Sequence, residues 1–318
     1  MTAATGQCAP HTWRPHPLHA AARDWPETNC YTDLWISLLH DRGFEPTAML
    51  GFLAAQDWEG DQFTFFKPPP QELRLLYGAT LRELAIYEVL EEHVTEALRR
   101  GEVILLEVDA WWLPDVAATA YRRHHTKTTI GILAADPGQR QLRYLHNAGR
   151  FTLQGEDYDG ILAGGGGAAL FPYAEAAGFL PEGGLTERAL RETAARLLRD
   201  YIQGARPTRP VQAFAADLPR LLQGLARRDA AALHRFSFNT LRQLGAGCEL
   251  LARHLLWLRE GEAVPAAAAA LEISASAKAL QFVLARQLRR GDNTPPAALQ
   301  GLAETHAAML DGLRRDFG

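Results

Sequence analysis

Cysteine is scarce in this chain, whose 318 residues include only Cys8, Cys30 and Cys248. An odd number of widely spaced cysteines cannot form a disulfide framework, so a disulfide-rich secreted scaffold is excluded and a reducing compartment is expected. The N-terminus lacks the charged start and apolar core of a signal peptide, and no stretch approaches the roughly 18 apolar residues of a membrane span. We therefore expect a cytoplasmic protein with no membrane partner.

An excess of positive charge is also missing. The chain has 33 basic and 37 acidic side chains and a formal net charge of -4, so no global field favours a phosphate backbone, and nucleic acid is not an expected partner. Metal binding is not expected either, because the spacing of Cys8, His11, His16 and His19 matches no closed tetrahedral pattern. The glycines at 164–167 lack the flanking residues of a phosphate-binding loop and indicate an ordinary loop.

The patterns that are present divide the chain into three parts. We expect an irregular N-terminal segment (1–25), a mixed α and β domain (26–184) and a helical bundle (185–318), which together give an α+β fold class. In the bundle, Leu and Ala recur at helical spacing throughout. Within the mixed domain the patterns predict helices at 30–41 and near 80–99, and β-strands at 103–108, on both sides of Asp136-Pro137-Gly138, and after Gly149.

Cys30 stands at the start of the first predicted helix. The spacing predicts one apolar stripe, formed by Tyr31, Leu34, Trp35, Leu38 and Leu39. Asn29 is a preferred N-cap, so Cys30 falls in the first turn. Unpaired N–H groups and the positive end of the helix dipole favour a thiolate there, which is the nucleophilic form. The alternative is a buried apolar cysteine that only fills the core, as we expect for Cys248 on a leucine-rich helix.

A cysteine nucleophile needs an imidazole base and a residue that orients it. His125 opens the first strand of the predicted hairpin, and Asn147 ends the second. The register of the hairpin decides which residue can orient His125. If the numbers of two residues paired across the hairpin add up to an even value, His125 shares a face with Asn147; if they add up to an odd value, it shares a face with His146. We favour Asn147, and a merely structural His125 remains the alternative.

Acidic side chains near this region are candidates for binding the ammonium group of a substrate. They are Glu59 and Asp61, which precede Gln62 in one loop, and Glu107 and Asp109 at a strand end. A solvated loop is the alternative for the first group. Arginines such as Arg122 and Arg123 are expected to be solvated, or to form a local basic patch for an acidic carrier protein.

Four stretches carry a resemblance to a known family. They are NCYTDLWISLLHDRGFEP, GFLAAQDWEGDQFTFFKPPP, ILLEVDAWWLPDVAATAYRRHHTKTTIGI and YLHNAGRFTLQGEDYDG. Together they resemble a bacterial family of unknown function whose genes lie beside amino acid:carrier-protein ligases, over most of residues 25–165. The first stretch is also similar, more distantly, to the N-terminal domain of the butirosin-biosynthesis acyltransferase.

This resemblance implies a thiol acyltransferase of papain-like, bacteriocin-processing-peptidase-like fold. Cys30 would be the nucleophile, His125 the base and Asn147 the orienting residue, where related enzymes often have aspartate. The usual oxyanion-hole glutamine before the cysteine is absent from residues 24–27. The Cys30 backbone N–H is therefore the first candidate donor and Gln62 the second.

The expected reaction moves an acyl or aminoacyl group from a carrier-protein thioester to an amine or hydroxyl acceptor. The partner would be an acyl or peptidyl carrier protein that brings its own phosphopantetheine, so no cofactor of this chain is expected. Two alternatives stay open: a thioesterase or amidase with the same triad, and a non-catalytic module that binds a carrier protein or metabolite.

Overall fold

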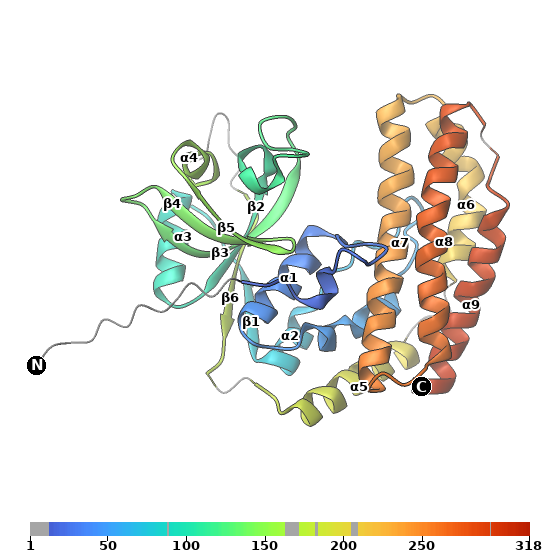
Figure 1. Ribbon diagram of the computed structural model, residues 1–318, viewed down its shortest axis with the longest axis horizontal. Coiled ribbons are helices and arrows are strands. Elements are labelled where there is room, and N and C mark those ends of the chain that lie inside the picture. Colours follow the sequence, from blue (N-terminus) through green and yellow to red (C-terminus); the bar gives the residue numbers. More distant parts are fainter. Residues whose placement is uncertain (1–12, 88, 163–171, 182–183, 205–208, 293) are drawn as a thin grey trace, which may run out of the picture.

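The computed structural model describes residues 13–87, 89–162, 172–181, 184–204, 209–292 and 294–318. Figure 1 shows a sheet with its covering helices on one side and long helices standing side by side on the other. The chain is thus α+β in its N-terminal part and all-helical in its described C-terminal part. This arrangement agrees with the fold class expected from the patterns of hydrophobicity.

Six antiparallel strands form the sheet, in the order β1-β6-β2-β3-β4-β5. They are β1 (Ala79–Glu83), β2 (Val103–Asp109), β3 (Lys127–Asp136), β4 (Gln141–His146), β5 (Gly149–Gln154) and β6 (Ala174–Phe179). The helices of this part are α1 (Cys30–Asp41), α2 (Pro70–Tyr77), α3 (Leu90–Arg99) and α4 (Glu156–Leu162). Short 3-10 helices cover Pro17–His19, Pro46–Ala55, Ala110–Trp112 and Pro114–Val116.

The two faces of the sheet belong to different hydrophobic cores. The face toward α1 carries Val103, Leu105 and Leu145 and shares one core with the C-terminal helices. The opposite face carries residues such as Ile104 and Tyr144 and packs against α3 and α4. Side chains of a strand alternate between the two cores, so odd and even positions of β2 and β3 have different surroundings.

The prediction of a helix near 80–99 is wrong for the first half of this range. Residues 79–83 form β1, which pairs with β6 from Ala79↔Phe179 to Glu83↔Glu175, and the helix α3 begins only at Leu90. The long-range pairing with β6 decides the conformation of this short segment, and local periodicity does not show it. Neither β6 nor α2 was among the predicted elements, and the glycines at 164–167 lie outside the described residues.

The C-terminal part consists, in the described residues, of α5 (Glu187–Gly204), α6 (Pro210–Leu225), α7 (Ala230–Leu258), α8 (Pro265–Arg289) and α9 (Ala298–Phe317). The longest of these helices, α7, continues through Gly245. A Cβ atom at Gly245 would lie 2.5 Å from the Trp25 ring, so glycine permits this close approach. Of the helices described, only α8 is long and apolar enough to cross a membrane by length and composition, a test that buried core helices also pass.

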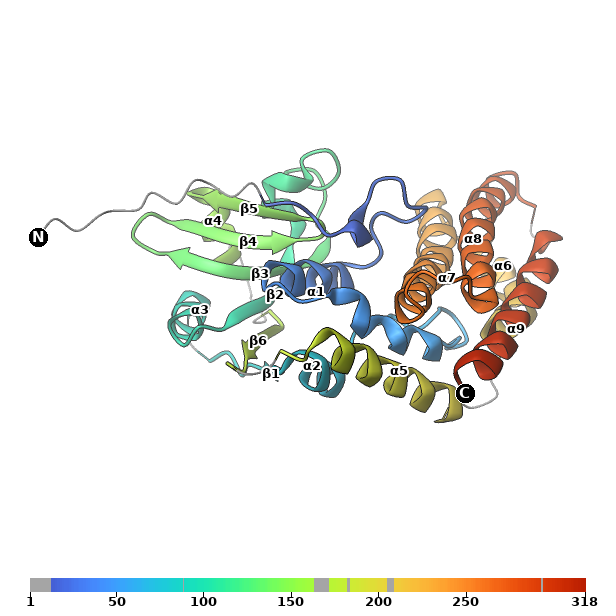
Figure 2. The same cartoon turned by 60° about the horizontal axis from the view of Figure 1, so that its bottom comes forward.

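Residues 13–25, the described part of the N-terminal segment, lie between the two parts of the molecule (Figure 2). Leu18 and Trp25 are buried in the core, and the Arg23 guanidinium forms a buried ion pair with Glu249 of α7 at 3.0 Å. Glu249 also accepts hydrogen bonds from the backbone N–H groups of Asp24 and Trp25. Residues 13–25 contain one short 3-10 helix and are an integral part of the packing.

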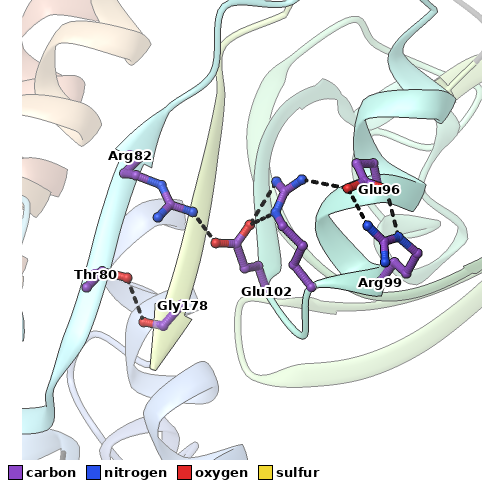
Figure 3. A network of polar contacts seen from close by, with 7 residues as sticks. Thr80, Arg82, Glu96, Arg99, Glu102 and Gly178 are labelled. Carbon is purple, nitrogen blue, oxygen red and sulfur yellow. Dashed lines mark hydrogen bonds and ion pairs between the residues drawn. The ribbon is translucent and has the colours of Figure 1, made fainter. Parts of the chain in front are cut away.

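A network of surface ion pairs connects β1, an edge strand of the sheet, to α3 (Figure 3). Glu102, just before β2, accepts from Arg82 of β1 and from Arg100, and Glu96 of α3 pairs with Arg99 and Arg100. Arginine side chains here are 44–73% exposed, so each pair adds no more than about 1 kcal/mol to stability. This region therefore supports the edge of the sheet and offers no buried chemistry.

Candidate functional site

Cys30 is the first residue of α1, as the sequence predicts. The Asn29 side chain accepts a hydrogen bond from the Thr32 N–H at 2.9 Å, and Asp33 in return accepts from the Thr28 N–H at 2.8 Å. This reciprocal cap leaves the Cys30 thiol half-buried, with its Sγ 3.5 Å from Thr129 Oγ1 of β3. Cys30 is therefore a thiol at a helix N-terminus that faces a strand hydroxyl.

Thr129 shows which face of the sheet the thiol meets. Thr129 pairs with Glu107 of β2, and a Cβ at Gly131, two residues further, would contact Leu34 of α1. By strand alternation Lys127 lies on this same face, and its ammonium donates to Glu107 at 2.8 Å. Cys30 thus lies beside a hydroxyl whose cross-strand neighbour belongs to an ion pair.

His125 is held by Asp109. The imidazole Nδ1 donates to Asp109 Oδ2 at 2.6 Å, and the ring stacks on Trp111 with centroids 4.6 Å apart. Partial burial would raise the pKa of Asp109, but the bonds from His125 and the N–H groups of Trp111 and Thr126 outweigh burial and hold the pKa below its usual range. His125 is 73% exposed, so this pair is open to a substrate.

Asn147, the residue predicted to orient His125, is not its hydrogen-bond partner. The register near the start of β3 has the even sum that favoured Asn147, as in Gly131↔Leu145. Asn147, however, lies in the turn between β4 and β5 with φ of 45°, and its backbone carbonyl accepts a hydrogen bond from Ser37 at 2.6 Å. The carboxylate of Asp109 reaches the imidazole instead, because β2 ends opposite the start of β3.

The structure does not bring the thiol and the imidazole into contact. His125 lies four residues before Thr129, which corresponds to about 13 Å along an extended chain. Both groups lie at the same end of the sheet, where β2 ends and β3 begins. The segment between β2 and β3, residues 110–126, carries His125.

A second His–Asp pair lies on the opposite face of the sheet. His146 Nδ1 donates to Asp115 Oδ2 at 2.6 Å, and its Nε2 is 2.8 Å from the Thr128 hydroxyl. Asp115 also accepts from the Tyr144 hydroxyl at 2.5 Å, and the His146 and Asp115 side chains are 2% and 4% exposed. Sequence patterns do not reveal this network, because its members lie far apart along the chain and show no common motif.

The acidic loop predicted to bind substrate lies between the two parts of the molecule. Asp61 and Gln62 line a cavity of about 530 Å³ whose other wall is formed by α7 residues such as Arg235. Phe65, at the same cavity, lies under the Lys127 ammonium, 5.9 Å from the ring centroid. Glu59 accepts from the Thr64 hydroxyl at 2.7 Å and shapes the loop.

Cys248, the other free cysteine described, has a different environment. It is 4% exposed, and burial raises its pKa to about 12. This agrees with the core role expected for it. No group of side chains able to hold a metal occurs among the described residues, which include His16 and His19 but neither Cys8 nor His11.

Arg122, which was predicted to be solvated or to form part of a basic patch, is engaged in ion pairs. Its guanidinium pairs with Asp157 at 2.6 Å and lies over the Trp112 ring. Burial would lower the pKa of Arg122, but the hydrogen bond with Tyr121 and the charges of Asp157 and Glu156 raise it. Arg122 therefore fixes the segment that carries His125.

Two family models match the chain. Residues 14–179 match the DUF1839 N-terminal domain, and residues 187–315 match the DUF1839 C-terminal domain. No curated protein matches the chain. With both matches covering nearly all of its length, the chain belongs to the DUF1839 family.

Proposed function

We propose that this protein is a cysteine-dependent acyl or aminoacyl transferase that uses Cys30 as its nucleophile. The observation that carries the proposal is a half-buried thiol at the first residue of α1, next to Thr129. The His125–Asp109 pair lies at the same end of the sheet. A helix N-terminus stabilises the thiolate, and its N–H groups suit the oxyanion of a tetrahedral intermediate. A papain-like active site fits this arrangement.

In the proposed reaction, His125 removes the thiol proton and Cys30 attacks the carbonyl of a carrier-protein thioester. The bond between the carbonyl carbon and the phosphopantetheine sulfur breaks, and that sulfur takes the proton from His125. An acceptor amine then attacks the Cys30 thioester and loses a proton to His125. The product is an amide, or an ester with a hydroxyl acceptor, and Cys30 recovers its proton.

This mechanism assigns the orienting role to Asp109 in place of Asn147. The Asp109 carboxylate fixes the Nδ1–H tautomer of His125, which leaves Nε2 as the base. Because the thiol and the imidazole are not in contact, the base step requires residues 123–126 to bring His125 toward Cys30 while Arg122 anchors the rest of the segment; the bond to Asp109 orients the imidazole in the resting enzyme.

The carrier protein is the proposed partner. The cavity lined by Gln62, Phe65 and Arg235 approaches Lys127 and offers a path for the phosphopantetheine arm. Exposed arginines on α7 complement an acidic carrier protein. Gln62 is the proposed second oxyanion donor, after the Cys30 N–H.

Mass spectrometry tests the proposal directly. The full chain is incubated with an aminoacylated carrier protein, and we expect a mass increase of one acyl group on Cys30 that disappears in Cys30→Ser. Cys248→Ser is the matched control and should acquire the same adduct. If carrier binding persists but no adduct forms on Cys30, the enzyme proposal is wrong and the protein is a binding module.

The fate of the adduct separates transfer from hydrolysis. Addition of a panel of amines should discharge the Cys30 thioester faster than water alone and give the corresponding amides. A thioester that is lost to water at the same rate, with free acid as the sole product, would identify a thioesterase.

A further inference from the structure

A separate cavity of about 440 Å³ lies between the N-terminal segment, α7 and α8. We call it the segment cavity. Pro26 and Glu27 in its wall precede Cys30 by four and three residues, and Ala148 comes from the turn between β4 and β5. The segment cavity therefore adjoins the N-terminal side of the proposed nucleophile without including it.

Two buried acceptors line the segment cavity without partners among the described residues. Gln281 of α8 is 2% exposed, and its side-chain oxygen has no hydrogen bond. His19 is 6% exposed; its Nε2 contacts the Ser37 hydroxyl, whose proton is donated to the Asn147 carbonyl. The proton of the neutral His19 ring is therefore on Nε2, and the unpartnered Nδ1 is an acceptor. Buried polar atoms of this kind are normally satisfied by a donor.

Charges in the segment cavity are also left without opposite charges. The Lys278 ammonium donates to the Asp24 carbonyl at 2.7 Å and lies 4.5 Å from the Trp25 ring centroid, and both of these partners are uncharged. Arg242 has an unpartnered buried Nε, and Glu27 has no cation within ion-pair distance among the described residues. Glu27 is exposed, and the Lys278 ammonium is also reached by water, but the buried Gln281 oxygen, His19 Nδ1 and Arg242 Nε together suit a ligand that carries both charges.

Aromatic side chains form the remaining walls. Trp25 and Phe238 line the interior, and Phe282 stands at the rim with 49% of its surface exposed. Ring faces of this size favour an apolar or aromatic group of the ligand.

We propose that the segment cavity binds a free α-amino acid with an apolar or aromatic side chain. Its carboxylate would contact Arg242 and Lys278, and its ammonium would contact the Gln281 oxygen, His19 Nδ1 and Glu27. This binding does not depend on the Cys30 chemistry. If the proposed function also holds, the bound amino acid supplies the acceptor amine for the acyl group.

Isothermal titration calorimetry on the full chain tests the site, with L-phenylalanine as the probe. Phenethylamine lacks the carboxylate and 3-phenylpropionate lacks the amine, so each should bind at least about tenfold more weakly than L-phenylalanine. Equal binding of either analogue, or the absence of heat with both L-phenylalanine and L-leucine at millimolar concentration, would overturn the proposal.

Variants locate the binding. Gln281→Leu should weaken L-phenylalanine binding about tenfold, whereas Arg253→Gln, an exposed position of α7 outside the segment cavity, should leave the affinity unchanged. Equal affinity for Gln281→Leu and the unmodified chain, with both folded by circular dichroism, would contradict the assignment. Cys30→Ser should bind L-phenylalanine normally, which separates this proposal from the one for Cys30.

Discussion

Two His–Asp pairs with the same hydrogen-bond length lie on opposite faces of one sheet. His125–Asp109 and His146–Asp115 both join Nδ1 to a carboxylate oxygen at 2.6 Å. The first imidazole is 73% exposed, whereas the second is 2% exposed and has its other nitrogen at Thr128. Geometry alone does not distinguish a reactive pair from a structural one; access and a free ring nitrogen do.

The two pairs therefore carry opposite expectations. Loss of His125–Asp109 should remove activity and leave the fold intact, because water replaces the lost contacts. Loss of His146–Asp115 should destabilise the fold, because water does not reach the groups left behind. The following experiments test each side of this comparison.

The largest effect is expected for His125→Asn. Without an imidazole base, the rate of Cys30 acylation by an aminoacylated carrier protein should fall about 10²–10⁴-fold, while the thermal unfolding curve stays unchanged. Intact-protein mass spectrometry over time gives the rate. A variant that is acylated as fast as the unmodified chain would remove His125 from the mechanism.

Asp115→Ala tests the buried pair. It leaves the His146 Nδ1–H and the Tyr144 hydroxyl without their acceptor, so the free energy of unfolding should fall by about 3–5 kcal/mol. Urea denaturation followed by circular dichroism measures this loss. A decrease below about 1 kcal/mol would show that the network is no more structural than an exposed ion pair.

His254 shows what burial does to a histidine that lacks a carboxylate. Its Nδ1 donates to the Thr47 carbonyl, and burial lowers its pKa from 6.5 to about 4. Since the folded pKa is the lower one, His254 contributes stability that is fully present above pH 6.5 and is lost as the pH falls through 4. This contribution amounts to about 3 kcal/mol.

His254→Gln retains a donor for Thr47 but does not titrate. Its loss of stability between pH 7 and pH 4 should therefore be smaller than that of the unmodified chain by about 3 kcal/mol. Urea denaturation at a series of pH values gives both curves. Parallel curves would mean that His254 is protonated without cost in the folded protein.

The smallest effect is expected for Asp109→Ala. The free energy of unfolding should fall by about 1 kcal/mol, because the exposed pair with His125 is screened by water and the main loss is the cap of the Trp111 and Thr126 N–H groups. The same urea titration used for Asp115→Ala provides the direct contrast. A loss of several kcal/mol would place both pairs in the structural class.

The sequence predicts the helix start at Cys30 because the cap residue and the apolar stripe are local signals. It also identifies Asp109 and His125 individually. Their contact was not predicted, because it depends on β2 pairing with β3 so that Asp109 lies opposite Lys127. Pairing between strands is not visible in local patterns.

The buried network and the early strand show a different reason for failure. Asp115 and His146 are 31 residues apart, and Asp115 follows a proline in a segment without periodicity. Residues 79–83 are short and become a strand only through β6, almost 100 residues later. The segment cavity likewise arises from the N-terminal segment and two helices that no motif connects.

The buried contact between Arg23 and Glu249 has a consequence for dividing this protein. A cut between the two family domains, near residue 184, would separate Arg23 from Glu249 and would divide the hydrophobic core that both parts share. Water would then solvate the two charges, but each fragment would expose apolar side chains that are buried in the intact protein, which costs about 25 cal/mol per Å². The two domains are therefore separate matches in sequence, but the stability of each depends on the presence of the other in the same chain.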